Sequence, residues 1–201
     1  DVVSELPGED LRTVRRIDEG ILGAVEVDLP FGLPANGTGT LTATGARFET
    51  QTFATLVGNA RWALQNRDQR WHTELHASAG LVTDEAPAQS LFLLGGRETL
   101  PGYGYRDFVG NRFWLVRADG TFPLRSPWVS LHIFGGIGAS YLDARVVPSE
   151  WHARDSGGLR AAVGAGLALG WDVLRFDVGR GLRDGKWELI FSVMPRFRAW
   201  L

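Results

Sequence analysis

Apolar and polar residues alternate along most of this chain with a period of two, which is typical of β-strands that have one face in each of two environments. In the clearest example, Arg70–Leu81, an apolar set alternates with a polar set: Trp71, Leu75, Ala77 and Ala79 against His72, Glu74, His76 and Ser78. The only helical feature that the pattern predicts is a short turn in Glu9–Arg16. The chain is therefore expected to be an all-β protein.

The alternation and its interruptions predict about nine antiparallel strands. Their expected ranges are Ile21–Phe31, Gly39–Glu49, Ala54–Leu64, Arg70–Leu81, Arg112–Phe122, Trp128–Leu142, Arg160–Gly170, Leu174–Gly181 and Trp187–Phe197. Short turns at Gln65–Gln69, Pro123–Pro127 and Gly170–Val173 alternate with long loops at Val82–Asn111 and Asp143–Leu159. Short turns at one end and long loops at the other are the arrangement of up-and-down outer-membrane barrels.

One face of the predicted strands carries charged residues far from the strand ends: Glu26, Asp28, Arg61, Glu74, Arg117, Asp119, Arg175 and Asp177. Half-buried strands of a soluble sandwich or a lipocalin-like barrel also alternate, so alternation alone leaves a soluble fold open. Charges at these positions suit a wet lumen better than a dry core. The polar face is therefore predicted to line the interior of a membrane barrel.

Composition supports the same class of fold. The 201 residues suffice for one domain, and the net charge of −2 gives no basic field to attract nucleic acid. Cysteine is absent, whereas the chain has 26 glycines and 8 tryptophans. Five tryptophans gather near the predicted short-turn end, where a membrane–water interface would favour them: Trp62, Trp71, Trp128, Trp171 and Trp200. No apolar run approaches the roughly 18 residues of a transmembrane helix, but barrel strands need only about 10 alternating residues.

No motif of the chain predicts catalysis, and we expect neither a cofactor nor a metal. His72, Glu74 and His76 share a strand face, but their spacing spreads them over about 13 Å. Lining of a polar lumen is the favoured interpretation of these three residues over a metal site. The chain is expected not to be an enzyme.

The last predicted strand, Trp187–Phe197, is similar to the C-terminal signal by which outer-membrane barrels are recognised for assembly. Its odd positions are apolar and its ends aromatic: Trp187, Leu189, Phe191, Val193, Pro195 and Phe197. Assembly factors bind such a strand by pairing with its edge. This strand is a candidate seam of the barrel.

Three segments together resemble the BamA/TamA superfamily, also called the bacterial surface antigen family. Leu93–Gly96 followed by Pro101–Tyr103 is similar to that family's "LGG…RGY" loop. Val163–Gly166 with Leu174–Val178 is similar to its "GxGL…RFDxA" strand pair, which contains Arg175 and Asp177. The terminal strand is the third segment. The resemblance covers Ile21 to Phe197 and implies the C-terminal half of a 16-stranded transmembrane barrel.

The resemblance implies a signature loop whose candidate residues are Gly95, Gly96, Arg97, Pro101, Gly102, Tyr103 and Arg106. In the family, an arginine at the loop tip pairs inside the lumen with an aspartate of an "FxDxG" strand. Here Pro101 takes the place of the arginine, and the strand reads Phe134-Gly135-Gly136-Ile137-Gly138. Loss of both partners avoids an isolated charge in a poorly solvated site. One hypothesis is that Arg97 or Arg106 substitutes, reaching Asp177, Glu74 or Asp119.

The predicted organisation is a lead-in segment or extracellular loop remnant at 1–20 and a barrel portion at 21–201. By resemblance, the protein would lie in the outer membrane of a Gram-negative bacterium and take part in protein insertion, assembly or translocation. Its expected partners are outer-membrane lipid, the barrel assembly machinery and client outer-membrane proteins. Two alternatives remain: a pore, anchor or surface antigen barrel without insertase activity, and a soluble β-barrel that binds an apolar ligand.

Overall fold

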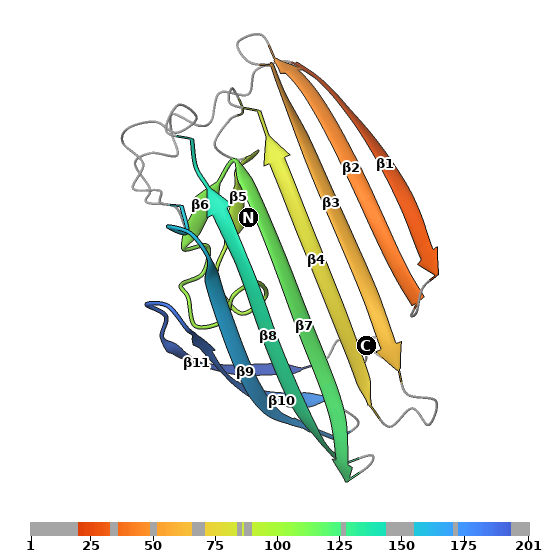
Figure 1. The fold of residues 1–201 in the computed structure, drawn as a ribbon, viewed down its shortest axis with the longest axis vertical. Helices are drawn as coiled ribbons and strands as arrows, with labels where there is room; N and C mark the ends of the chain where they lie inside the picture. The colour runs from red at the N-terminus through yellow and green to blue at the C-terminus, as the bar shows by residue number, and fades with distance from the viewer. Residues whose placement is uncertain are drawn as a thin grey trace.

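The computed structural model describes residues 20–32, 36–48, 52–65, 71–83, 86, 90–125, 128–143, 155–170 and 173–193, and within them the chain is a curved antiparallel sheet (Figure 1). The strands are β1 (Gly20–Gly32), β2 (Asn36–Phe48), β3 (Thr52–Gln65), β4 (His72–Val82), β5 (Phe92–Leu94), β6 (Phe108–Gly110), β7 (Arg112–Arg125), β8 (Val129–Tyr141), β9 (Arg160–Leu169), β10 (Leu174–Gly181) and β11 (Trp187–Val193). The expected all-β class is confirmed.

Nine strands form the main sheet in the order β1-β2-β3-β4-β7-β8-β9-β10-β11, and β5 pairs with β6 as a separate two-stranded sheet. Each strand of the main sheet pairs with its neighbour in the chain, apart from the β4–β7 step, where the segment containing β5 and β6 intervenes. The sheet does not close on itself within the described residues, so β1 and β11 are its two edges. In Figure 1, β10 and β11 are the blue strands at the lower left, and they run crosswise to the long strands because the sheet curves.

The two faces of the sheet differ in chemistry, as the alternation predicts. The inner face is the one that contacts the segment between β4 and β7. Strand register places the expected charged residues on this face. For example, Arg61 lies opposite His76, His76 opposite Arg117, and Arg117 opposite Gly136. The outer face presents exposed apolar side chains: Val27, Leu41, Leu56, Leu81, Ile133, Ile137, Val163, Leu167, Phe176, Val178, Leu189, Phe191 and Val193. A soluble protein rarely exposes so large an apolar surface, whereas lipid requires one.

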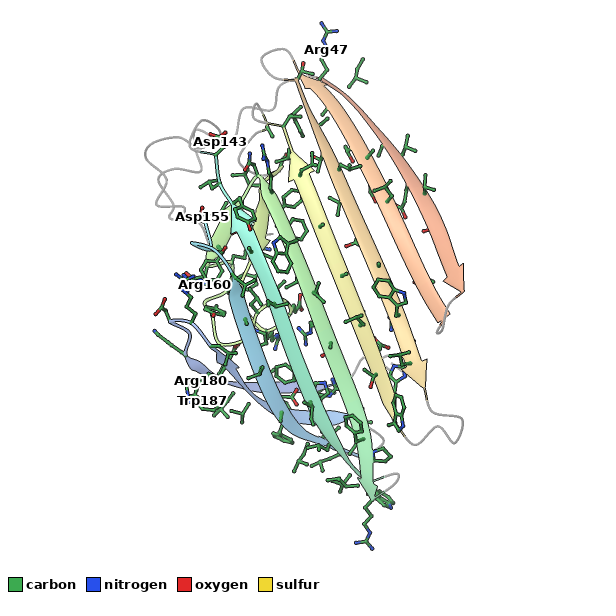
Figure 2. The ribbon with its side chains drawn as sticks, viewed as in Figure 1. Arg47, Asp143, Asp155, Arg160, Arg180 and Trp187 are labelled. Atoms are coloured by element: carbon green, nitrogen blue, oxygen red, sulfur yellow. The ribbon has the colours of Figure 1, made fainter. Side chains whose placement is uncertain are left out.

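Aromatic and basic side chains at the strand ends fit the same interpretation. Trp71 and Trp128 are exposed at the end of the sheet where β3 joins β4 and β7 joins β8. At the opposite end, the Arg180 guanidinium lies 5.0 Å from the centre of the Trp187 ring on the outer face (Figure 2). Such rings have an apolar body and a polar N–H, which suits a membrane–water boundary. Trp171 and Trp200 lie outside the described residues.

The prediction that short turns lie at one end of the sheet and long loops at the other is wrong in two places. The connections between β2 and β3 and between β10 and β11 are short, although they lie at the same end as the two long loops. β5 and β6 are not among the predicted strands, because three-residue strands are too short to show a period. The expected helical turn at Glu9–Arg16, the lead-in segment before Gly20 and the end of the last strand at Phe197 all fall outside the described residues.

Candidate functional site: the loop inside the sheet

The segment from β5 to β6 turns sharply into the concave side of the sheet at a pair of glycines. Gly95 and Gly96 have φ values of 115° and 88°, a backbone region that L-residues with side chains rarely adopt. A Cβ at Gly95 would lie 2.9 Å from the Asp107 nitrogen. The Gly95 N–H donates a 2.8 Å hydrogen bond to the Thr99 hydroxyl, which closes the turn. The predicted Gly-Gly entry therefore has a steric reason.

The tip of this loop is buried against the inner face. Leu100 and Pro101 are fully buried, and Tyr103 is 6% exposed. Their apolar cluster also contains Leu94, Phe108 and Ala162, with Tyr103 and Phe108 in an edge-to-face contact at 5.3 Å between ring centres. Burial of this set stabilises the loop inside the sheet by removing several large side chains from water.

Small residues on β8, β9 and β10 make room for the loop tip. A Cβ at Gly136 would lie 3.2 Å from the Thr99 carbonyl oxygen, and one at Gly179 would lie 2.9 Å from the Pro101 Cβ. A Cβ at Gly181 would lie 2.8 Å from the Tyr103 ring. Gly136, the position where the family resemblance leads us to expect an aspartate, therefore accommodates loop backbone instead of a carboxylate.

Hydrogen bonds fasten the tip to the hairpin formed by β10 and β11. The Gly102 N–H donates to Oε2 of Glu188 at 2.8 Å, and the Lys186 N–H donates to the Gly102 carbonyl at 2.6 Å. The Tyr103 hydroxyl donates to the Ala161 carbonyl at 3.2 Å and accepts from the Arg183 N–H at 3.1 Å. The loop is thus held through main-chain groups and one phenol, without an arginine at its tip.

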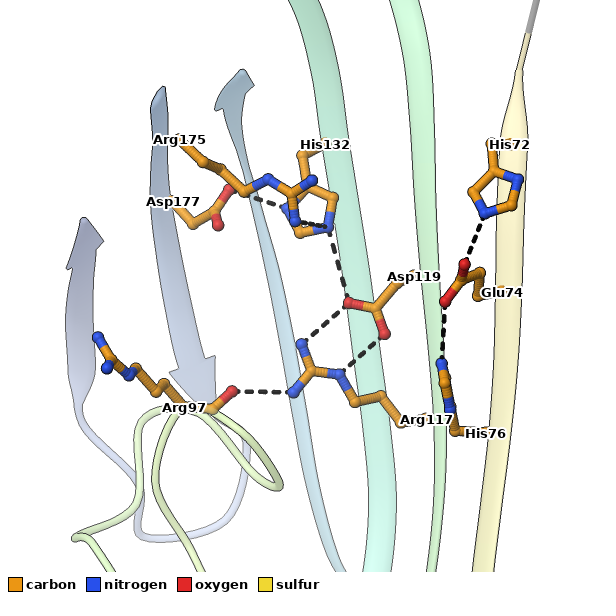
Figure 3. A network of polar contacts seen from close by, with 9 residues as sticks. All are labelled: His72, Glu74, His76, Arg97, Arg117, Asp119, His132, Arg175 and Asp177. Carbon is orange, nitrogen blue, oxygen red and sulfur yellow. Dashed lines mark hydrogen bonds and ion pairs between the residues drawn. The ribbon is translucent and has the colours of Figure 1, made fainter. Parts of the chain in front are cut away.

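A second set of contacts involves charged side chains on the inner face of β7, β8 and β10, which we call the polar wall. Arg117 forms a two-point ion pair with Asp119, at 2.8 Å from Nε and 2.9 Å from Nη2, and its Nη1 donates to the Arg97 carbonyl at 2.8 Å (Figure 3). His132 lies between two carboxylates, 3.6 Å from Asp119 and 2.9 Å from Asp177. This chain of charges connects β7, β8 and β10 and reaches the loop through the Arg97 main chain.

Arg175 joins the same wall, with its Nη1 3.4 Å from Nε2 of His132. A cavity of about 340 Å³ lies between this wall, the loop and β11, lined by both charged and apolar groups: Arg97, Glu98, Arg117, His132, Phe134, Arg175, Asp177, Ile190 and Ser192. The predicted strand motif, Arg175 and Asp177, therefore lies on the inner face beside the loop. It is part of a polar wall that several strands share.

Glu74 organises a separate polar group on β3 and β4. Its carboxylate contacts Arg61 at 2.6 Å, His72 at 2.7 Å and His76 at 3.2 Å. The two imidazoles bend toward Glu74, so the three residues of β4 lie closer together than the extended spacing predicts. Within the described ranges, no cluster of three or more histidine, cysteine or acidic residues has the geometry to hold a metal ion.

The structure brings together five of the predicted loop residues: Gly95, Gly96, Pro101, Gly102 and Tyr103. Arg97 contributes its carbonyl, and the Arg106 guanidinium lies 4.7 Å from the Tyr105 ring centre. The hypothesis that Arg97 or Arg106 pairs with Asp177, Glu74 or Asp119 is wrong, because in the part of the chain described here neither guanidinium forms an ion pair with those carboxylates. Arg117 of β7 is the arginine that pairs with Asp119 instead.

The apolar residues of the last strand lie on the outer face of an edge. Trp187, Leu189, Phe191 and Val193 are all exposed, and the Phe176 and Phe191 rings are 4.9 Å apart. Phe197 lies outside the described residues. The role of these residues in assembly stays a prediction.

Sequence reasoning missed Glu188, His132 and the small inner residues of β8 to β10 as parts of the site. The small residues did leave a signal, because glycine and alanine recur at every second position: Gly136 and Gly138, Ala162, Gly164 and Gly166, Gly179 and Gly181. A strand face without side chains indicates that something else packs there. Glu188 left no such signal, since its partner lies 86 residues away.

Comparisons with known proteins agree with this architecture. A family model described as the Omp85 superfamily domain matches residues 21–181. The chain is similar to the crystal structure of BamA from Haemophilus ducreyi lacking POTRA domains 1–3, with a TM-score of 0.62 and 12% identity over 87% of this chain and 42% of that chain. The chain thus spans less than half the length of that structure. No curated protein matches it. No helix among the described residues is long and apolar enough to cross a membrane.

Proposed function

Because the chain belongs to the Omp85 superfamily, in agreement with the sequence resemblance, we propose that it forms part of a barrel that inserts, assembles or translocates proteins at the bacterial outer membrane. The observation that carries the proposal is a loop docked inside a curved sheet whose last strand is an edge. Outer-membrane lipid would cover the apolar outer face, and client outer-membrane proteins and the barrel assembly machinery would be its partners. The proposed role is not enzymatic.

The edge strand β11 supplies a mechanism for such a role. Among the described residues it pairs only with β10. An edge strand offers unpaired N–H and C=O groups to an incoming strand. A client strand could therefore add to β11 while the outer face stays in lipid.

Strand direction favours closure by further strands over closure by a second copy. The nine strands of the sheet alternate in direction, so its two edges, β1 and β11, run the same way. Direct pairing of these edges, within one chain or between two copies, would be parallel. An odd number of additional strands would close an antiparallel barrel and satisfy the edge groups, which lipid cannot do. We propose that such strands come from the same polypeptide.

The second candidate function is a pore, anchor or surface antigen barrel without insertase activity. The specific observation in its favour is that Pro101 and Gly136 stand where the family resemblance predicts an arginine and an aspartate. The soluble β-barrel is disfavoured by the apolar outer face.

Reconstitution of the full-length protein in phospholipid vesicles separates these functions. Folding of an unfolded client outer-membrane barrel would be followed by its heat-modifiable gel mobility, with empty vesicles as the control. The proposed function predicts faster client folding, whereas the pore or anchor function predicts the same folding rate as in empty vesicles. High solubility of the protein without detergent would eliminate both membrane functions.

A further inference from the structure

We propose that Glu188 is a positioning residue that fastens the loop tip to the last strand, so that β11 separates from β10 only when the loop leaves its place. The contact between Gly102 and the hairpin of β10 and β11 is called the tip latch below, and it consists of Gly102, Lys186 and Glu188. This inference concerns a conformational coupling within the barrel. It does not depend on the insertase function proposed above.

The tip latch binds both main-chain polar groups of Gly102, its N–H and its carbonyl. Its N–H donates to the Glu188 carboxylate at 2.8 Å, and its carbonyl accepts from the Lys186 N–H at 2.6 Å. Hydrogen bonds between a carboxylate and a main-chain N–H are among the stronger ones in proteins. Both partners of Gly102 belong to the hairpin, at the start of β11 or one residue before it, so movement of β11 breaks both bonds together.

The tip latch contacts the two main-chain groups whose hydrogen bond closes the hairpin of β10 and β11. The Gly181 N–H donates to the Lys186 carbonyl at 3.4 Å, and a Cβ on Gly102 would collide with both of those groups. Gly102 also has a φ of 83°, so a residue with a side chain would be strained there as well. The tip therefore packs directly against the closed end of the hairpin.

Contacts on either side of Gly102 extend the coupling. Pro101 packs over Gly179, which is the register partner of Glu188, and the Tyr103 hydroxyl accepts from the Arg183 N–H in the hairpin turn. Release of the loop would remove a donor from Glu188 and an acceptor from Arg183 in a part-buried site, which is unfavourable. Coupling of this kind is reciprocal, so a loosened loop must also loosen β11.

Hydrogen–deuterium exchange of the full-length protein in lipid nanodiscs, without any client, tests the latch. The variants are Glu188→Ala, Glu188→Gln, which keeps an acceptor oxygen, and Tyr103→Phe, which weakens the tip from the loop side. Glu98→Ala, which removes an exposed carboxylate of the same loop, is the matched control. Exchange is compared in the peptides that contain residues 99–103 and 187–193.

The latch predicts that Glu188→Ala accelerates exchange about tenfold or more in both peptides, that Glu188→Gln stays near wild type and that Tyr103→Phe also accelerates exchange in β11. Glu98→Ala should leave both peptides unchanged. Acceleration confined to one of the two peptides, or no acceleration in either, would overturn the proposal. If Glu188→Ala does not fold, Tyr103→Phe decides the question, since an unchanged β11 would contradict reciprocity. Because no client is present, the result is independent of whether the protein inserts clients.

Discussion

Arg117 and Asp119 lie two residues apart on the inner face of β7 and form a two-point ion pair at 2.8 and 2.9 Å. The third donor of the Arg117 guanidinium reaches the loop at the Arg97 carbonyl. In the family that this chain resembles, the corresponding pair joins a loop arginine to a wall aspartate. Here both charges lie on the wall, and the loop contributes only a main-chain oxygen.

Replacement of Arg117 is expected to loosen the loop. Arg117→Lys keeps the charge, but an ammonium cannot bridge both Asp119 oxygens and also reach the Arg97 carbonyl with the geometry of a guanidinium. Limited proteolysis of the folded protein should cleave the loop faster in Arg117→Lys and faster still in Arg117→Ala. Arg61→Ala, which removes a 55% exposed partner of Glu74, is the control and should have little effect. Equal cleavage of wild type and Arg117→Ala would contradict the role given to Arg117.

The glycines beneath the loop should be intolerant of side chains. Gly179→Ala places a methyl group 2.9 Å from the Pro101 Cβ and is expected to destabilise the fold by about 1–3 kcal/mol. Gly135→Ala is the matched control on the outer face, where a Cβ meets its nearest atom at 3.6 Å. The stability of both variants is measured as the temperature at which half of the protein loses the gel mobility of the folded form. A Gly179→Ala variant as heat-resistant as Gly135→Ala would show that the loop does not pack on β10.

Restoring only one partner of the family's ion pair should be harmful. Gly136→Asp introduces a carboxylate against the Thr99 carbonyl and Leu100, opposite Arg117, whose guanidinium already pairs with Asp119. Overlap with the loop and competition of two carboxylates for one guanidinium are expected to destabilise the fold by about 1–3 kcal/mol, and the loop should become accessible to protease. The double variant Gly136→Asp with Pro101→Arg should recover part of the loss. An unimpaired single variant would argue that Gly136 is open to water rather than covered by the loop.

Adjacent residues of β2 test which face lies in lipid. Leu41 is on the outer face and Thr42 on the inner face, where it pairs with Glu26. Leu41→Arg should reduce folding into phospholipid vesicles by about 2–4 kcal/mol if this position lies near the bilayer centre. Thr42→Arg should fold almost as well as wild type, because its charge enters the polar interior. The reverse order of the two variants would mean that the faces are assigned wrongly.

The strands and their faces could be predicted from sequence because alternation is a local property that each strand carries by itself. Trp71 through Leu81 show it without any knowledge of their neighbours. The way the loop is held could not be predicted, since it depends on pairs far apart in the chain, such as Gly102 with Glu188 and Arg117 with Arg97. A loop inside the sheet was implied only by the family resemblance of the Gly-Gly entry and the Gly-Tyr tip, and the missing arginine spoke against its being locked there. These motifs did not indicate that a wall arginine would replace one at the tip.

The most direct test of the central claim is a disulfide between the loop and the wall. The chain has no cysteine, so Leu100→Cys with Gly136→Cys introduces a single possible bridge. A Cβ at residue 136 lies 3.6 Å from the Leu100 side chain, whereas residue 135 belongs to the outer face. The account predicts that the folded 100/136 pair oxidises to a disulfide and that the 100/135 pair does not. Failure of the folded 100/136 pair to cross-link, or equal cross-linking of both pairs, would contradict a loop docked inside the sheet.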